Sequence, residues 1–235
     1  MAGSGEKTGV LNGHSPRQVL GEGDNRQAIL DAATQEFAEK GFAGARVHAI
    51  AAEAGVNIAL LYYYFNTKER LYAAVLEQLF ADWAQRATAA LGGHDTPKQK
   101  LIAYTEAYFD FVAEAPHRPR LVQQEMSQLG PTAVQSLTAL AKQYVRPVHQ
   151  AVLKVLNVGY EQGQFRRVSP DFVHSISALI VSYFTSSTFI QVVTGHNPLT
   201  PARVAERRNS VRDTISAALF APSESGQIKS KEGHQ

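Results

Sequence analysis

The segment from Val47 to Leu71 constrains the fold more than any other part of this chain. Its first half carries apolar residues at the spacing of a short helix that buries one face: Ile50, Ala51 and Ala54. Gly55 then ends that helix, because glycine readily adopts the positive φ of a left-handed turn. Asn57 is a good N-cap for a second helix over residues 58–65. Two short helices joined by a tight glycine turn predict a helix-turn-helix.

Three segments in and around this motif resemble the N-terminal domain of TetR-family transcriptional regulators, over about residues 25–75. They are AILDAATQEFAEKGFAG (28–44), IAAEAGV (50–56) and LYYYFNTKERLY (61–72). The last segment, an aromatic cluster followed by a short turn and Lys-Glu-x-Leu, is highly specific to that family. A helix-turn-helix alone would also fit a corner between two helices of any all-helical protein.

Helical periodicity continues through most of the chain, and no strand pattern appears. We therefore predict an all-α fold of about nine helices: residues 25–40, a short helix beginning at 45–46, and residues 58–65, 68–91, 96–114, 118–128, 132–162, 169–195 and 201–220. Pro147 lies inside the seventh of these and is expected to kink it.

The predicted organisation has four parts. A disordered arm (1–24) precedes a helix-turn-helix DNA-binding domain (25–68), a helical ligand-binding and dimerisation domain (69–220) and a disordered tail (221–235). An expression remnant is the simpler interpretation of the arm, and an extension that reaches the minor groove is the functional one.

Motif and composition argue against an enzyme. The chain has no cysteine, which excludes disulfides, thiolate metal sites and cysteine nucleophiles. The patterns HExxH, GxSxG, GxGxxG and the Walker-type glycine loop are absent from the sequence. Glu114 and His117 have a metal-like spacing, but a proline break separates them. We expect no catalytic residue, no metal site and no cofactor.

Residues 175–193 lack a charged side chain and so need weighing as a membrane span. Eight of these nineteen residues are Ser, Thr or Gln, whereas a spanning helix is predominantly apolar. We interpret the segment as a helix buried against protein. The N-terminal residues 1–15 also lack the apolar run of a signal peptide. We expect a cytoplasmic protein without membrane contact.

The charge of the N-terminal region is unusual for a DNA-binding domain. Residues 1–70 contain seven Lys or Arg against eight Asp or Glu, a net charge of −1. Phosphate binding usually comes with a basic patch. However, residues 57–67 contain no acidic side chain. We expect modest non-specific affinity, with base contacts and backbone amides contributing more than usual.

The second helix of the motif is the predicted recognition helix, because an α-helix fits the major groove of B-DNA. The resemblance implies phosphate contacts by Asn57 and Lys68, and base or backbone contacts by Tyr62 and Tyr63. Arg46 stands where the family usually has a capping Ser or Thr, and it can reach a phosphate as a charge. The predicted DNA-binding residues are Arg46, His48, Asn57, Ile58, Ala59, Tyr62, Tyr63 and Lys68.

Three positions depart from the family pattern: Ile58, Ala59 and Leu60 stand where members commonly have Lys, Gly and Thr. Ile58 and Ala59 offer only apolar contacts, most naturally to thymine methyl groups. We therefore expect T-rich operator positions facing them. Packing within the small domain is the alternative interpretation of the tyrosines at 62–64.

Specific binding requires more surface than one recognition helix offers, so such modules dimerise. The predicted helices 169–195 and 201–220 are suited to this, since two copies of each make a four-helix bundle. The resemblance implies the same homodimer. Burial of residues 169–195 within one subunit is the alternative. A twofold dimer predicts a palindromic double-stranded DNA operator.

The remaining helices are expected to hold a small-molecule effector. The predicted ligand-binding residues are Trp83, Tyr104, Tyr108, Phe111, Gln124, Met126, Tyr144, His149 and Tyr183. Aromatic residues at helical spacing are more often core than pocket. The resemblance implies that the ligand moves the fourth helix and changes the separation of the recognition helices.

The functional prediction is therefore a ligand-responsive repressor whose effector is not identified by the residues. Whether such a regulator activates or represses transcription depends on promoter position, which a protein sequence does not contain. The competing class is a helical adaptor whose helix-turn-helix binds protein, and a lack of salt-dependent DNA binding would favour it.

Overall fold

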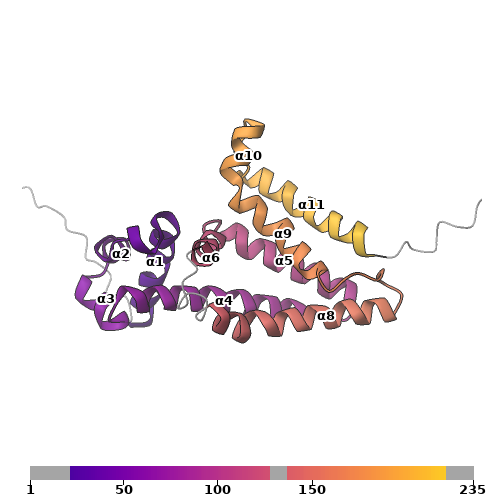
Figure 1. Ribbon diagram of the computed structural model, residues 1–235, viewed down its shortest axis with the longest axis horizontal. Coiled ribbons are helices and arrows are strands. Elements are labelled where there is room, and N and C mark those ends of the chain that lie inside the picture. The colour runs from indigo at the N-terminus through magenta and orange to yellow at the C-terminus, as the bar shows by residue number, and fades with distance from the viewer. Residues whose placement is uncertain (1–21, 128–136, 221–235) are drawn as a thin grey trace, which may run out of the picture.

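The protein is described by a computed structural model that covers residues 22–127 and 137–220 (Figure 1). The predicted tail and residues 1–21 of the predicted arm lie outside these ranges, while residues 22–24 already belong to the first helix. Within them the fold is all-α, as predicted. The helices are α1 (Glu22–Gly44), α2 (Val47–Glu53), α3 (Ile58–Phe65), α4 (Lys68–Gly92), α5 (Pro97–Glu114), α6 (Arg118–Ser127), the π-helix η1 (Ala141–Val145), α8 (Arg146–Glu161), α9 (Phe172–Thr185), α10 (Ser187–Thr194) and α11 (Pro201–Leu219).

The helices form two groups that share α4 (Figure 1). Helices α1, α2 and α3 gather around the first half of α4. The second half of α4 continues beside α5 and α8, and α9 and α11 lie above them. α10 projects from the end of α9, away from α4 and α8.

Two hydrophobic cores correspond to these groups. The N-terminal core contains fully buried residues of α1, α2 and α3 and the beginning of α4, such as Phe37, Ile50, Leu61 and Leu71. The C-terminal core contains residues of α5, α8, α9 and α11 and the end of α4. Leu121 of α6 belongs to the N-terminal core, although α6 follows α5 in sequence. α6 therefore joins the two groups a second time.

Local sequence chemistry explains where several helices begin and end. Gly41 interrupts α1 with φ of 69°, and Gly55 makes the turn after α2 with φ of 68°. The side chain of Thr67 accepts a 3.2 Å hydrogen bond from the backbone N–H of Arg70 at the start of α4. Thr96 forms a capping box with Gln99 at the start of α5.

Two predicted long helices differ in detail from the structure. Of the predicted helix over 132–162, residues 137–161 are described and are helical throughout: α-helical at 137–140, π-helical in η1 and α-helical again in α8. Residues 128–136 are not described. Pro147 lies inside this helical run, as predicted, just after η1, where the backbone N–H of Arg146 bonds to the carbonyl oxygen of Ala141 five residues earlier. The predicted helix over 169–195 was wrong as a single element, because it breaks at Ser186 into α9 and α10.

Hydroxyl side chains immediately before this break favour a bend there. Ser182 and Thr185 each donate a hydrogen bond back to the carbonyl oxygen four residues earlier, an arrangement that bends helices. Among the described residues no single helix is long and apolar enough to cross a membrane. The pair α9 and α10 reaches that length and composition only together, with a 67° bend between them.

Candidate nucleic-acid interface and ligand cavity

The predicted recognition helix α3 packs on the N-terminal core with its apolar face. Leu61 is fully buried and Phe65 nearly so, and both pack in the N-terminal core. At its N-terminus, the side-chain oxygen of Asn57 accepts a 2.7 Å hydrogen bond from the backbone N–H of Leu60. This bond uses the oxygen of Asn57 for capping and leaves its amide NH₂ to donate elsewhere.

The opposite face of α3 is exposed. Tyr62 is 42% exposed and Tyr63 70% exposed, values that are unusual for large aromatic side chains. Tyr64, in contrast, packs against the N-terminal core. Of the predicted DNA-binding residues, the structure places six on the exposed surface: Arg46, His48, Asn57, Ala59, Tyr62 and Tyr63. Ile58 and Lys68 are half-buried.

Lys68 has partners within the protein. Its ammonium group donates hydrogen bonds to the carbonyl oxygens of Ala45 and, at 3.5 Å, Ala43, and it lies 5.0 Å from the centre of the Phe42 ring. These contacts tie the start of α4 to the end of α1 and to the loop that follows α1. In this structure Lys68 thus holds α4 against α1 instead of projecting freely.

Glu36 is a residue of this region that the sequence did not single out. Its carboxylate accepts a 3.1 Å hydrogen bond from the backbone N–H of Arg46 at the start of α2, and a 2.7 Å bond from Lys40. The bond from Lys40 is the main reason why the pKa of Glu36 lies below its usual value. Arg46 makes no side-chain cap, as expected, and Glu36 instead fixes the start of α2 from another helix by accepting from the backbone N–H of Arg46.

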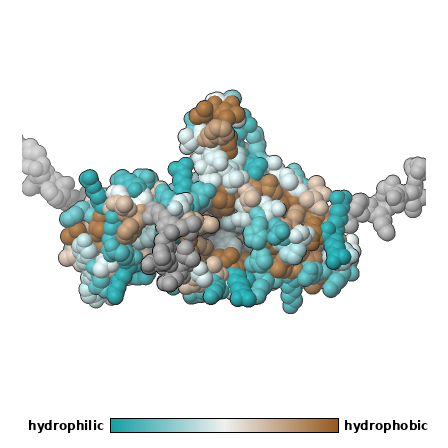
Figure 2. All heavy atoms as spheres, viewed as in Figure 1, coloured by the Kyte–Doolittle hydropathy of each residue, from teal (hydrophilic) through white to brown (hydrophobic). Residues whose placement is uncertain are grey.

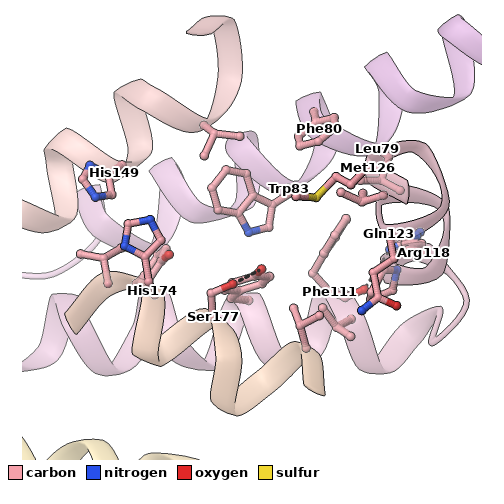
Figure 3. Close-up of a pocket in the computed structure, with 18 residues that line it drawn as sticks. Leu79, Phe80, Trp83, Phe111, Arg118, Gln123, Met126, His149, His174 and Ser177 are labelled. Carbon is pink, nitrogen blue, oxygen red and sulfur yellow. Dashed lines mark hydrogen bonds between the residues drawn. The ribbon is translucent and has the colours of Figure 1, made fainter. Parts of the chain in front are cut away.

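A cavity of about 310 Å³ lies in the C-terminal group, between α4, α5, α6, α8 and α9 (Figure 3). Six of the nine predicted ligand-binding residues line it: Trp83, Tyr104, Tyr108, Phe111, Met126 and His149. Burial raises the pKa values of Tyr104 and Tyr108. The volume of the cavity lies at the lower end of the range for small-molecule pockets.

The other three predicted ligand-binding residues do not line this cavity. Gln124 turns toward α1 and donates a 3.2 Å hydrogen bond to the carbonyl of Ala38. The Tyr144 hydroxyl donates to Glu77 at 3.3 Å, and the Tyr183 hydroxyl donates to the carbonyl of Pro198 at 2.7 Å.

Polar groups in the cavity come mostly from residues that the sequence did not single out. Ser177 lies 3.1 Å from the hydroxyl of Tyr108. Arg118 and Gln123 lie at one end of the cavity, and His174 lies beside His149 at the other (Figure 3). Helical spacing could not identify these residues, because their direction depends on how α6 and α9 are rotated against α5.

α6 contacts different parts of the protein with its two faces. Pro119, Val122 and Met126 line the cavity, whereas Leu121 and Gln124 contact the N-terminal group. A helix that touches both a cavity and the core beneath a recognition helix provides a physical connection between them.

The tip of α10 is an exposed apolar surface (Figure 2). Phe189 is 70% exposed, Val192 78% and Val193 66%. Contiguous exposed apolar side chains of this kind belong to interaction surfaces more often than to ordinary protein surface.

Comparison with known protein families agrees with this arrangement. The family of bacterial regulatory proteins, tetR family, matches residues 29–75, and the tetracyclin repressor-like C-terminal domain matches residues 97–215. The HTH-type transcriptional repressor NicS of Pseudomonas putida is 30% identical over 163 residues, which cover 68% of this chain and 71% of NicS.

Solved structures are similar over most of the chain. The transcriptional regulator SCO4942 of Streptomyces coelicolor is 26% identical, with a TM-score of 0.62 over 82% of this chain and 97% of SCO4942. A regulator of Saccharomonospora viridis in complex with choline has a TM-score of 0.64 at 23% identity, over 85% of this chain and 99% of that one, and shows the fold alone. The two family matches and the relationship to NicS show that this chain belongs to the TetR family of transcriptional regulators.

Proposed function

We propose that the chain is a repressor that binds a palindromic operator as a homodimer and is released when a small molecule occupies the cavity. The observation that carries the proposal is the position of α6, which lines the cavity with one face and packs in the N-terminal core with the other. The name of NicS, a transcriptional repressor, supports the direction of the effect.

The exposed face of α3 is the proposed DNA-reading surface. Tyr62 and Tyr63 present ring faces and hydroxyl groups without belonging to the core, while Ala59 allows close approach to thymine methyl groups. Arg46, His48 and Asn57 are exposed around this face and contribute charge or donors to phosphates. Ile58 adds apolar contact through its exposed part, and Lys68 acts mainly by positioning α4.

The proposed dimer uses α9 and α11, with α10 extending the contact. The apolar tip of α10 gives a reason for association, because Phe189, Val192 and Val193 leave water when a second copy covers them. Dimerisation doubles the DNA contacts and gives the operator its twofold symmetry. A bacterial DNA-binding regulator acts where the chromosome is, and we therefore assign the protein to the cytoplasm.

The proposed release follows from the two connections between the groups, α4 and α6. A ligand that fits the cavity better when these helices are displaced shifts the population toward the displaced state. The separation of the two recognition helices in the dimer then no longer matches the operator. A difference of a few kcal/mol in ligand affinity between the two states is sufficient.

Selection from a random duplex library tests the DNA-binding part of this proposal. We expect enrichment of a palindrome whose half-sites carry T·A pairs at positions facing Ile58 and Ala59. Recovery of only G·C pairs at those positions would contradict the apolar readout. A library without any enriched sequence would favour the protein-adaptor class.

A further inference from the structure

The part of the cavity lining that the structure describes contains one buried hydrogen-bond donor without a partner. The indole nitrogen of Trp83 is buried and has no hydrogen-bond partner within residues 22–127 and 137–220. The ring is held by an edge-on contact with Tyr108, with centroids 5.6 Å apart. An indole N–H can only donate, and an unpaired buried donor is unfavourable. A ligand that brings an acceptor oxygen removes this cost.

Trp83 lines the cavity, and its nitrogen, although buried, faces a polar part of the lining (Figure 3). In Figure 3, Trp83 lies in the middle of the cavity with its nitrogen directed toward Ser177. The hydroxyl groups of Ser177 and Tyr108 are bonded to each other at 3.1 Å. His149 and His174 lie toward one end, with ring centroids 5.6 Å apart, and Arg118 lies toward the other. Two hydroxyl groups therefore lie near the indole, and the histidines and Arg118 lie at the two ends of the cavity (Figure 3).

The charge of the lining favours an anion. Arg118 is a permanent cation, and no aspartate or glutamate occurs among the described residues that line the cavity. The guanidinium is held 4.6 Å from the centre of the Phe111 ring, and one of its nitrogens donates to the Phe111 carbonyl at 3.0 Å. Nearby Glu114 is paired with Arg86 at 2.8 Å and stays outside the lining.

We propose that the cavity selects a small apolar carboxylic acid, whose carboxylate accepts a hydrogen bond from the indole N–H of Trp83. The apolar body of the ligand lies against the side chains of Leu79, Phe80 and Phe111. This assignment rests on the proposed function, in which the cavity is the effector site. The competing ligand is a quaternary ammonium compound, because aromatic rings also form cages for such cations.

Trp83 itself reports the binding, because it is the only tryptophan in the chain. We would titrate the full-length protein with phenylbutyrate, phenylbutanol and phenylbutyltrimethylammonium, which share one body and differ in the head group. We expect a saturable change in tryptophan emission, with phenylbutyrate binding about tenfold more tightly than the alcohol and the ammonium compound binding more weakly than both. Equal or tighter binding of the ammonium compound would overturn the assignment.

Two variants measured by calorimetry separate the N–H group from the apolar wall. Trp83→Phe keeps an aromatic ring but removes the donor, so we expect about a tenfold loss for phenylbutyrate and a smaller loss for the alcohol. Phe80→Leu, the matched control, changes only apolar contact and affects the three probes alike. An unchanged preference for the carboxylate in Trp83→Phe would overturn the role of the indole. The head-group series on the wild-type chain decides the ligand class if this variant does not fold.

Measuring DNA affinity separately distinguishes failure of this inference from failure of the proposed function. DNA binding without ligand, combined with no preference for the carboxylate, overturns the ligand class alone. Carboxylate-selective binding that leaves DNA affinity unchanged supports the ligand class and overturns the proposed release.

Discussion

The side-chain amide of Gln124 on α6 donates a 3.2 Å hydrogen bond to the backbone carbonyl of Ala38 on α1. Its neighbour Gln123 instead lines the cavity (Figure 3). Two consecutive glutamines therefore contact different groups, Gln124 the N-terminal group and Gln123 the cavity of the C-terminal group. Leu121, one turn earlier, is fully buried in the N-terminal core and keeps α6 in this orientation.

Alanine substitution of these two glutamines is predicted to separate coupling from ligand binding. Gln124→Ala removes the bond between α6 and α1, so the effect of a ligand on DNA affinity should weaken by roughly 0.5–2 kcal/mol. Ligand affinity itself should change little. Gln123→Ala should lower ligand affinity and leave the effect of bound ligand on DNA affinity nearly unchanged. Calorimetry for the ligand and anisotropy for the DNA measure both quantities, and equal behaviour of the two variants would contradict the role of α6.

Tyr62→Ala tests the DNA-reading surface. Because Tyr62 is 42% exposed, its removal should leave the melting temperature nearly unchanged. Affinity for the selected operator should fall about tenfold, or roughly 1.4 kcal/mol. Tyr160→Ala on α8, another half-exposed tyrosine at 50%, is the control and should bind DNA normally. A loss of thermal stability in Tyr62→Ala would instead favour its role in packing.

Phe189→Asp tests the proposed contact of α10 with a second copy. Burying an unpaired carboxylate in an apolar interface is strongly unfavourable, so the dimer dissociation constant should rise at least about a hundredfold. Light scattering across a concentration series measures this change. Tyr160→Asp introduces the same charge elsewhere on the surface and should remain dimeric. A Phe189→Asp protein that dimerises like wild type would place the interface elsewhere.

His117 gives the stability a predictable pH dependence. Partial burial lowers its pKa in the folded state, with a further decrease caused by the charge of Arg118. The unfolded chain therefore binds this proton first as the pH falls below about 6.5, and stability decreases until the folded-state pKa is reached. His117→Gln should flatten this slope in melting experiments between about pH 7.5 and about pH 5.5. His94→Gln, at an exposed loop histidine, should retain it.

Much of the N-terminal group could be predicted from local chemistry. Gly41, Gly55 and Asn57 have the conformations that their residue types favour, and Leu61 and Phe65 occupy the buried face that the spacing indicated. These features depend on interactions within a few residues, which a sequence displays directly. The DNA contacts themselves remain predictions.

The C-terminal group was harder to predict because its features depend on how helices rotate against one another. Gln124 was expected in the cavity, but a difference of one position along α6 turns it toward α1 while Gln123 lines the cavity. The break at Ser186 was missed for a similar reason. Serine and threonine either continue a buried helix or bend it through bonds to preceding carbonyls, and the apolar pattern is the same in both cases.

The most direct test of the central claim is a fluorescence anisotropy titration of the purified protein onto duplex DNA from its own upstream intergenic region. The titration is made at about 50 mM and about 200 mM salt, with unlabelled competitor DNA. We predict tight, competitor-resistant binding that weakens as salt increases. Absence of binding at both salt concentrations by a folded dimer would contradict a DNA-binding regulator and favour the protein-adaptor class.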